Sequence, residues 1–183
     1  MNIDNCIKGR RSVRKYKDKK LPWKKLAFIL DAARYSPSAG NLQNWRFIII
    51  DDKEKKDKIS TACLGQKWMN QAPIFIIVCS DNSTTDKFYK NSKYTTQNCA
   101  VAIQNIMLKA YSLGLGTCWV GAFDERAIKR DLKIPDNISV EAIITLGYPD
   151  QKVEMPKRMD LGTILSFNEF GKKDPDTMFP LKK

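Results

Sequence analysis

Strand-length apolar runs alternate along this chain with longer segments of helical periodicity, and this alternation limits the folds available to it. The runs are WRFIIID (45–51), APIFIIVCS (72–80) and SVEAIITLGYP (139–149). Apolar runs of this length are typical of strands buried on both faces. Because helical segments lie between them, the sequence predicts a layered α/β or α+β domain with a sheet between helices.

Helical periodicity is clearest in two of the intervening segments. Between 21 and 36, apolar residues recur at the i, i+3, i+4, i+7 spacing of one helix face. The segment 95–116 is apolar on most of its circumference, so its helix must be buried on several sides, in a core or at a subunit interface. Further helices are expected at 2–11, 52–63, 124–134 and 160–165, a loop at 81–93, and a short strand or loop at 117–123.

Length and composition favour one globular domain. The chain has 183 residues, of which 43% are hydrophobic and 28% charged. Its start, MNIDNCIKGRR, lacks the apolar stretch of a secretory signal. The densest apolar run, IFIIVC (74–79), is far shorter than the ~20 residues of a membrane-spanning helix. A soluble cytoplasmic protein without membrane association is the expectation.

Cysteine and histidine usage narrows the chemistry. The five cysteines are odd in number and form no C-x-x-C pair, so we expect reduced thiols in a core rather than disulfides or a metal site. The sequence contains no histidine, which removes Ser-His-Asp and Cys-His catalysis and the commonest general acid–base. An enzyme of this composition takes its chemistry from a bound cofactor.

The basic charge allows two interpretations. A net charge of +12 is compatible with nucleic-acid binding, or with a basic surface that carries one anion site. The lysines are spread along the whole chain, and RNP, KH and zinc-finger patterns are absent. We therefore do not expect nucleic acid as the partner, although a basic nucleic-acid-binding domain stays an alternative.

The segment GRRSVRKYKDKK (9–20) carries the densest basic cluster. In an extended conformation Arg10, Ser12 and Arg14 point to one side, and the residues between them to the other. Two guanidinium groups flanking a hydroxyl suit a phosphate. The alternative, a solvated basic face, is what the charge run alone favours.

Four segments in this order resemble the FMN-dependent nitroreductase family: RRSVRKY (10–16), SPSAGNLQNWRF (36–47), GLGTCWVGAFDE (114–125) and LGYPDQKVEMPKR (146–158). The resemblance implies an α+β fold, with a central, mainly antiparallel sheet flanked by helices. It also implies an interlocked homodimer that binds FMN, formed by a single domain, 1–183. The C-terminal arm, 166–183, would wrap the partner subunit, and the alternative is a partly disordered tail.

The resemblance implies roles for the basic residues. Arg10, Ser12 and Arg14 would hold the FMN phosphate and ribityl chain, with Arg11 among the cofactor-binding residues. After the GYP turn, Arg158 would reach the same phosphate, with Lys157 as a second candidate. A surface charge is the alternative for Arg158.

Other positions follow from the same resemblance. Gly121 would offer its backbone N–H to flavin N5, with Val120 and Ala122 beside it, and the glutamate that many relatives carry here is missing. Gln66 is a candidate for the pyrimidine edge of the flavin, or a surface residue. A loop from the other subunit would reach the flavin through Pro37, Ser38, Ala39, Asn41 and Gln43. Asn44 stands where family members commonly have proline.

The implied activity is that of an FMN-dependent oxidoreductase. NAD(P)H would reduce the flavin, which would pass electrons to a nitroaromatic, a quinone or a similar small acceptor in a ping-pong cycle. Arg14 is the best candidate to stabilise the reduced flavin, and we nominate no protein residue as acid, base or nucleophile. The alternative within the family is a different flavin reaction: flavin-consuming, dehalogenating or azoline-oxidising.

Overall fold

The computed structural model describes residues 1–83, 87, 89 and 93–173. The chain divides into two compact units, Met1–Val153 and Glu154–Lys183, and each is described by itself. The single-domain organisation expected from the resemblance therefore stays a prediction.

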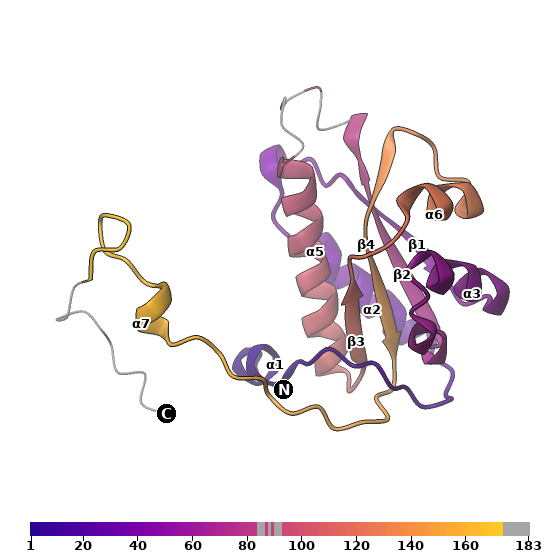
Figure 1. Cartoon of the computed structure of the whole chain (residues 1–183), viewed down its shortest axis with the longest axis horizontal. Helices are drawn as coiled ribbons and strands as arrows, with labels where there is room; N and C mark the ends of the chain where they lie inside the picture. Colours follow the sequence, from indigo (N-terminus) through magenta and orange to yellow (C-terminus); the bar gives the residue numbers. More distant parts are fainter. Residues whose placement is uncertain (84–86, 88, 90–92, 174–183) are drawn as a thin grey trace. The chain divides into compact units, whose positions relative to one another are not determined.

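Among the described residues, four strands form one sheet in the first unit (Figure 1). They are β1 (Trp45–Ile50), β2 (Ile74–Asp81), β3 (Gly116–Val120) and β4 (Ile138–Gly147), in the order β1-β2-β4-β3. All three pairings are antiparallel. The sheet is therefore antiparallel, as predicted, and the three apolar runs form β1 and the two central strands.

Helices cover both faces of this sheet. On one side α2 (Trp23–Arg34) and α5 (Lys93–Ser112) pack together, and on the other lie α3 (Lys53–Ala62) and α6 (Glu125–Leu132) (Figure 1). Alternate residues of β2 belong to two separate apolar clusters: Ile76 and Val78 face the α2 and α5 side, while Phe75 and Ile77 face the other side. The α+β layering expected from the sequence is thus confirmed.

Three further short helical elements lie in the described part of the first unit. Helix α1 (Ile3–Gly9) precedes the basic segment, and η1 (Ala39–Asn41) lies in the loop before β1. The sequence did not predict η2 (Lys67–Gln71), a 3-10 helix between α3 and β2. The predicted N-cap of α6 is confirmed, because Asp124 Oδ1 accepts from the Ala127 N–H at 3.1 Å. Of the loop expected at 81–93, residues 84–86, 88 and 90–92 lie outside the described residues.

Helix α5 is buried on one side and open on the other. Its inner face includes Ile103 and Ile106, which are fully buried between the sheet and α2. On the opposite face Tyr94 and Val101 are each 38% exposed. The sequence makes this helix apolar on most of its circumference, but one chain buries only part of that apolar surface.

All five cysteines are buried and unpaired, which confirms the expectation of reduced core thiols. Burial raises the pKa of Cys63, Cys79 and Cys99 to about 12. These thiols are therefore neutral and unreactive at physiological pH.

Between residues 154 and 173, the described part of the second unit, there is one short helix, α7 (Leu161–Ile164), close to the expected position. Asp160 caps it by accepting from the Gly162 N–H at 2.8 Å. Phe170 of the expected arm is fully exposed, whereas Met178 and Phe179 lie outside the described residues. No helix in the described part of the chain is long and apolar enough to span a membrane.

Candidate functional site

The basic N-terminal segment lies along the edge of the sheet. Ser12 forms a parallel bridge with Thr117 of β3, and the Val13 N–H donates to the Thr117 carbonyl at 2.9 Å. This approach requires a glycine in β3, since a Cβ at Gly116 would lie 2.7 Å from Val13 Cγ2. At its other end the segment pairs with the turn after β4, where Tyr16 bridges Pro149. The segment is thus fixed at both ends.

Tyr16 anchors the segment from beneath. Its side chain is 5% exposed, and its hydroxyl lies 2.7 Å from the Val13 carbonyl and 2.7 Å from Thr145 Oγ1 of β4. Burial raises the pKa of Tyr16 well above its usual value, so the hydroxyl stays neutral and continues to donate.

The thiol of Cys118 in β3 is influenced by three of the predicted site residues. Burial raises the pKa of this thiol, while the positive charge of Arg14, a hydrogen bond with the Ser12 side chain and the charge of Arg10 oppose the rise. That Arg10, Ser12 and Arg14 converge on one phosphate stays a prediction, because Arg14 lies over Trp68 and Arg10 lines a pocket that Ser12 and Arg14 do not. The Ser12 side chain lies beside β3, within hydrogen-bonding reach of Cys118.

A tryptophan that sequence reasoning missed joins two of the predicted site residues. The Arg14 guanidinium lies over the Trp68 ring, 5.8 Å from its centroid, and Trp68 Nε1 donates to Gln66 Oε1 at 3.2 Å. Both Gln66 and Trp68 belong to the turn around η2. An isolated large aromatic residue in a polar stretch was the only signal in the sequence, and it did not indicate Arg14 as the partner.

The end of β3 is open to solvent. Val120 is buried, whereas Gly121 and Ala122 are exposed and Trp119 is 40% exposed. A Cβ added at Gly121 would meet nothing closer than Trp119 Nε1, at 3.6 Å. A flat ligand can therefore approach the backbone here, and the fold itself does not demand glycine.

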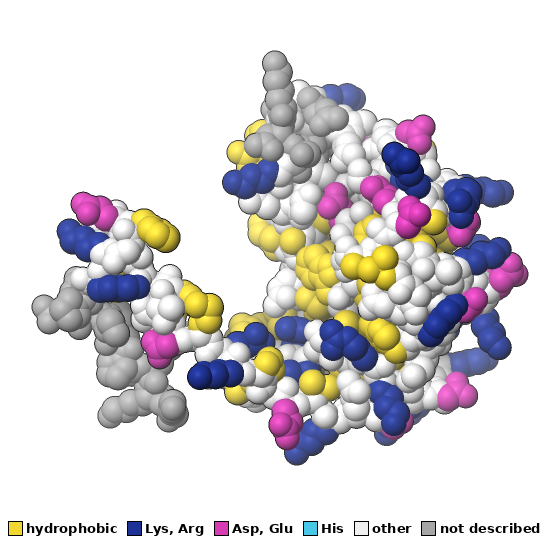
Figure 2. Space-filling view, viewed as in Figure 1, with side chains coloured by type: hydrophobic (Ala, Val, Ile, Leu, Met, Phe, Trp, Pro, Cys, Tyr) yellow, Lys and Arg dark blue, Asp and Glu magenta, His cyan; other side chains and the backbone are white. Residues whose placement is uncertain are grey.

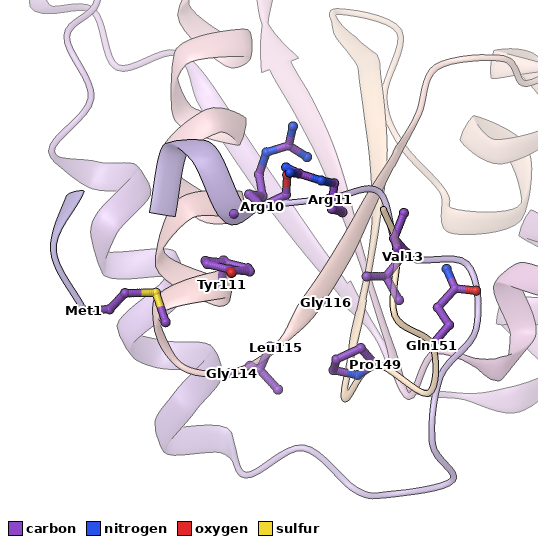
Figure 3. Close-up of a pocket in the computed structure, with 12 residues that line it drawn as sticks. Met1, Arg10, Arg11, Val13, Tyr111, Gly114, Leu115, Gly116, Pro149 and Gln151 are labelled. Carbon is purple, nitrogen blue, oxygen red and sulfur yellow. The ribbon is translucent and has the colours of Figure 1, made fainter. Parts of the chain in front are cut away.

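A pocket of about 320 Å³ lies beside the first part of the basic segment, between α1, the end of α5 and the turn after β4. Its wall includes Arg10, Arg11 and Tyr111, and Figure 3 shows the two guanidinium groups close together. Arg11 Nη1 donates to the carbonyls of Lys8 and Arg10, at 2.8 and 2.6 Å, so Arg11 is held by the backbone. Ser12, Arg14 and Gly121 do not line this pocket.

The loop predicted to reach the flavin lies elsewhere in the chain. Ser38 Oγ accepts from the Gln43 N–H at 3.1 Å, and Gln43 Nε2 donates to Asn41 Oδ1 at 3.0 Å. The side chain of Asn98, near the start of α5, accepts from the Ala39 N–H. The Arg10 pocket, in contrast, borders Tyr111 near the end of α5, 13 residues later, which is about 20 Å along the helix. One subunit therefore does not bring this loop to its own Arg10.

Lys157 and Arg158 lie in the second unit and are exposed. Their convergence with Arg10 stays a prediction. The remaining candidates, Pro37, Val120 and Ala122, occupy the loop before β1 and the end of β3.

Comparison with known proteins gives a consistent result. The model described as "Nitroreductase family" matches residues 7–68 and 62–148. A Methanothermobacter thermautotrophicus protein, provisionally named NADH dehydrogenase/NAD(P)H nitroreductase, is 38% identical over 165 residues, covering 88% of this chain and 83% of that protein. A Bacillus subtilis protein named FMN reductase (NAD(P)H) is 29% identical over 172 residues, covering 85% and 69%.

Among solved structures, the FMN-dependent nitroreductase from Clostridium difficile R20291 superposes with a TM-score of 0.80 at 34% identity. The match covers 91% of this chain and 99% of that one. Family match, relatives and fold agree, and the chain belongs to the nitroreductase family.

Proposed function

We propose that this protein is an FMN-dependent NAD(P)H oxidoreductase that reduces nitroaromatics, quinones or similar small acceptors. Family membership and the names of the relatives support the reaction class. The observation that carries the proposal is the basic segment fixed along β3, where Ser12 pairs with Thr117, beside a strand whose end is open at Gly121.

The donor set suits FMN. Guanidinium groups with a hydroxyl between them match a phosphate, because each phosphate oxygen accepts several charge-assisted hydrogen bonds. From Thr117, which pairs with Ser12, to Gly121 the strand advances four residues, or about 13 Å. The proposed phosphate donors on the segment beside β3 and the backbone N–H after its end would thus meet separate ends of FMN, its phosphate and its ring.

Residues around the ring position would orient the cofactor. The Gly121 N–H would face flavin N5, and Gln66, held by Trp68, would meet the pyrimidine edge. When bound, FMN would accept hydride from NAD(P)H and pass the electrons to the acceptor. The charge of Arg14 favours negative charge developing nearby. With no histidine in the sequence, protons for the acceptor would come from solvent.

A homodimer would complete the site. The loop carrying Pro37, Asn41 and Gln43 lies at the far end of α5 from Arg10, so it would serve the flavin of the partner subunit. Apolar side chains lie uncovered over α5 and β3 (Figure 2), including Val101 and Trp119. Exposed apolar surface of this kind is typical of an interface.

The phosphate assignment is testable with two ligands. We would titrate apoprotein with FMN and with riboflavin, which lacks the phosphate, and follow flavin fluorescence. The parent should prefer FMN, and Arg10→Ala/Arg14→Ala should lose most of that preference, because each charge-assisted bond contributes about 1.5–3 kcal/mol. Arg130→Ala, which removes only an exposed ion pair with Asp131, is the control.

Equal FMN affinity in the double variant and the parent would show that the phosphate binds elsewhere. A parent that takes up neither flavin would contradict the proposed function itself. An acceptor panel with NADH and NADPH would then separate nitroaromatic or quinone reduction from flavin-consuming, dehalogenating or azoline-oxidising chemistry.

A further inference from the structure

The turn at 40–43 has a strained backbone. Gly40, Asn41 and Gln43 all have left-handed conformations, with φ of 56°, 54° and 47°. Glycine adopts this region without strain, but asparagine and especially glutamine do so at a cost in free energy. Such a conformation persists only where the surrounding structure holds it. Something outside the turn must therefore fix its ends.

Asn98 of α5 fixes both ends. Its side chain is 4% exposed, Oδ1 accepts from the Ala39 N–H at 2.9 Å, and Nδ2 donates to Asn44 Oδ1 at 2.8 Å. Ala39 and Asn44 stand on either side of the strained turn. A single buried amide therefore spans the turn and ties it to a helix that is itself packed in the core.

Asn44 extends this connection to the sheet. It is fully buried, and its backbone carbonyl accepts from the Asp81 N–H of β2 at 2.8 Å. Its Nδ2 has no hydrogen-bond partner within the described part of the chain. Leaving a buried amide group unpaired is unfavourable, so two buried asparagines are a poor way to gain stability here. We interpret the two asparagines as fixing the conformation of the turn rather than as stabilising the fold.

We infer that Asn98 is a positioning residue for the flavin site of the partner subunit. It holds the turn so that Asn41 and Gln43 present their amides in one arrangement. The inference rests on the proposed function for its ligand and for the dimer, but the clamp itself is a property of the single chain. No chemical step is assigned to Asn98.

Hydrogen exchange of the apoprotein tests the clamp without any flavin. In Asn98→Ala the amides of residues 39–44 should exchange at least about tenfold faster, because the Ala39 N–H loses its acceptor and the turn loses its restraint. Asn105→Ala is the matched control. Asn105 has the same side chain seven residues along α5, but it donates to Ser36 Oγ and the Ala32 carbonyl at the end of α2. In Asn105→Ala the exchange rates of the amides of residues 39–44 should stay within about twofold of those in the parent.

Asn98→Asp guards against a variant that fails to fold. Aspartate keeps an acceptor for the Ala39 N–H, and the Asn44 amide can turn so that its Nδ2 donates to the second oxygen. This variant should restore protection of the turn relative to Asn98→Ala. Unchanged exchange of the turn in Asn98→Ala, or exchange in Asn98→Asp as fast as in Asn98→Ala, would overturn the positioning role.

Mixed dimers test action across the subunits. Pairing an Asn98→Ala chain with an Arg14→Ala chain leaves one site with intact arginines from the first chain and an intact loop from the second. The mixed dimer should therefore bind one FMN with parental affinity, whereas each homodimer binds FMN weakly. No recovery in the mixed dimer would mean that the clamp acts within its own subunit. If the parent binds no FMN, the proposed function fails, while the exchange experiment still decides the role of Asn98.

Discussion

Replacing Tyr16 with phenylalanine should loosen the segment that carries the phosphate donors. The variant keeps the buried ring and removes only the hydroxyl, which lies 2.7 Å from both the Val13 carbonyl and Thr145 Oγ1. Because the site is nearly sealed from water, the Val13 carbonyl is left without a replacement donor, and the free energy of unfolding should fall by about 1–3 kcal/mol. Urea unfolding followed by tryptophan fluorescence at pH 8 measures this loss.

The pH dependence of this loss gives a sharper test. Burial raises the folded-state pKa of Tyr16, so its contribution is complete below the unfolded pKa, near 10, and is lost as pH rises through the folded pKa. At pH 11 the unfolded parent gains about 1.4 kcal/mol by ionising this tyrosine, which the variant cannot do. The stability difference between parent and variant should shrink by about that amount.

Thr145→Val, alone and combined with Tyr16→Phe, isolates the coupling between the two hydroxyls. The reasoning would be refuted by a Tyr16→Phe variant as stable as the parent at pH 8. It would equally be refuted by a stability difference that stays constant between pH 8 and pH 11.

Three other perturbations separate fold from site. Gly116→Ala should lower the free energy of unfolding by about 1–3 kcal/mol, since the new Cβ meets Val13. Gly121→Ala should change the free energy of unfolding by less than about 1 kcal/mol yet weaken FMN binding. A Gly121→Ala variant with parental FMN affinity would argue against the N5 contact. Trp68→Phe keeps a ring under Arg14 but loses the donor to Gln66, so FMN affinity should fall several-fold, and an unchanged affinity would remove Gln66 from the site. Burial raises the folded-state pKa of Cys63, Cys79 and Cys99 to about 12, so the stability that these thiols contribute below pH 9 should be lost progressively between pH 9 and 12. Cys99→Ala should make this fall in the free energy of unfolding with pH less steep. An equally steep fall in parent and variant would contradict the reasoning.

The layers of the fold were predictable because apolar runs and helical periodicity report burial directly. The central strands, α2, α5 and α6 all lie where the pattern places them. The period-two geometry of an extended segment also predicts that Arg10, Ser12 and Arg14 share one side, and this stays a prediction. These are local regularities, and local spacing is what a sequence records best.

Contacts between distant segments were not predictable. Neither the stacking of Arg14 on Trp68 nor the clamp from Asn98 to Ala39 and Asn44 leaves a spacing signature, because each partner sits on a different element. Asn44 is the clearest case. Its sequence position suggested only a missing proline, whereas the structure shows a fully buried residue. Its side-chain oxygen accepts from Asn98 of α5, and its backbone carbonyl accepts from Asp81 of β2.

A crystal structure of the protein loaded with FMN tests the central claim most directly. The phosphate should lie within hydrogen-bonding distance of Arg10 and Ser12, the ring should lie against the Gly121 N–H, and residues 37–43 contacting it should belong to the second subunit. FMN bound away from β3, or a phosphate that contacts neither Arg10 nor Ser12, would contradict the account.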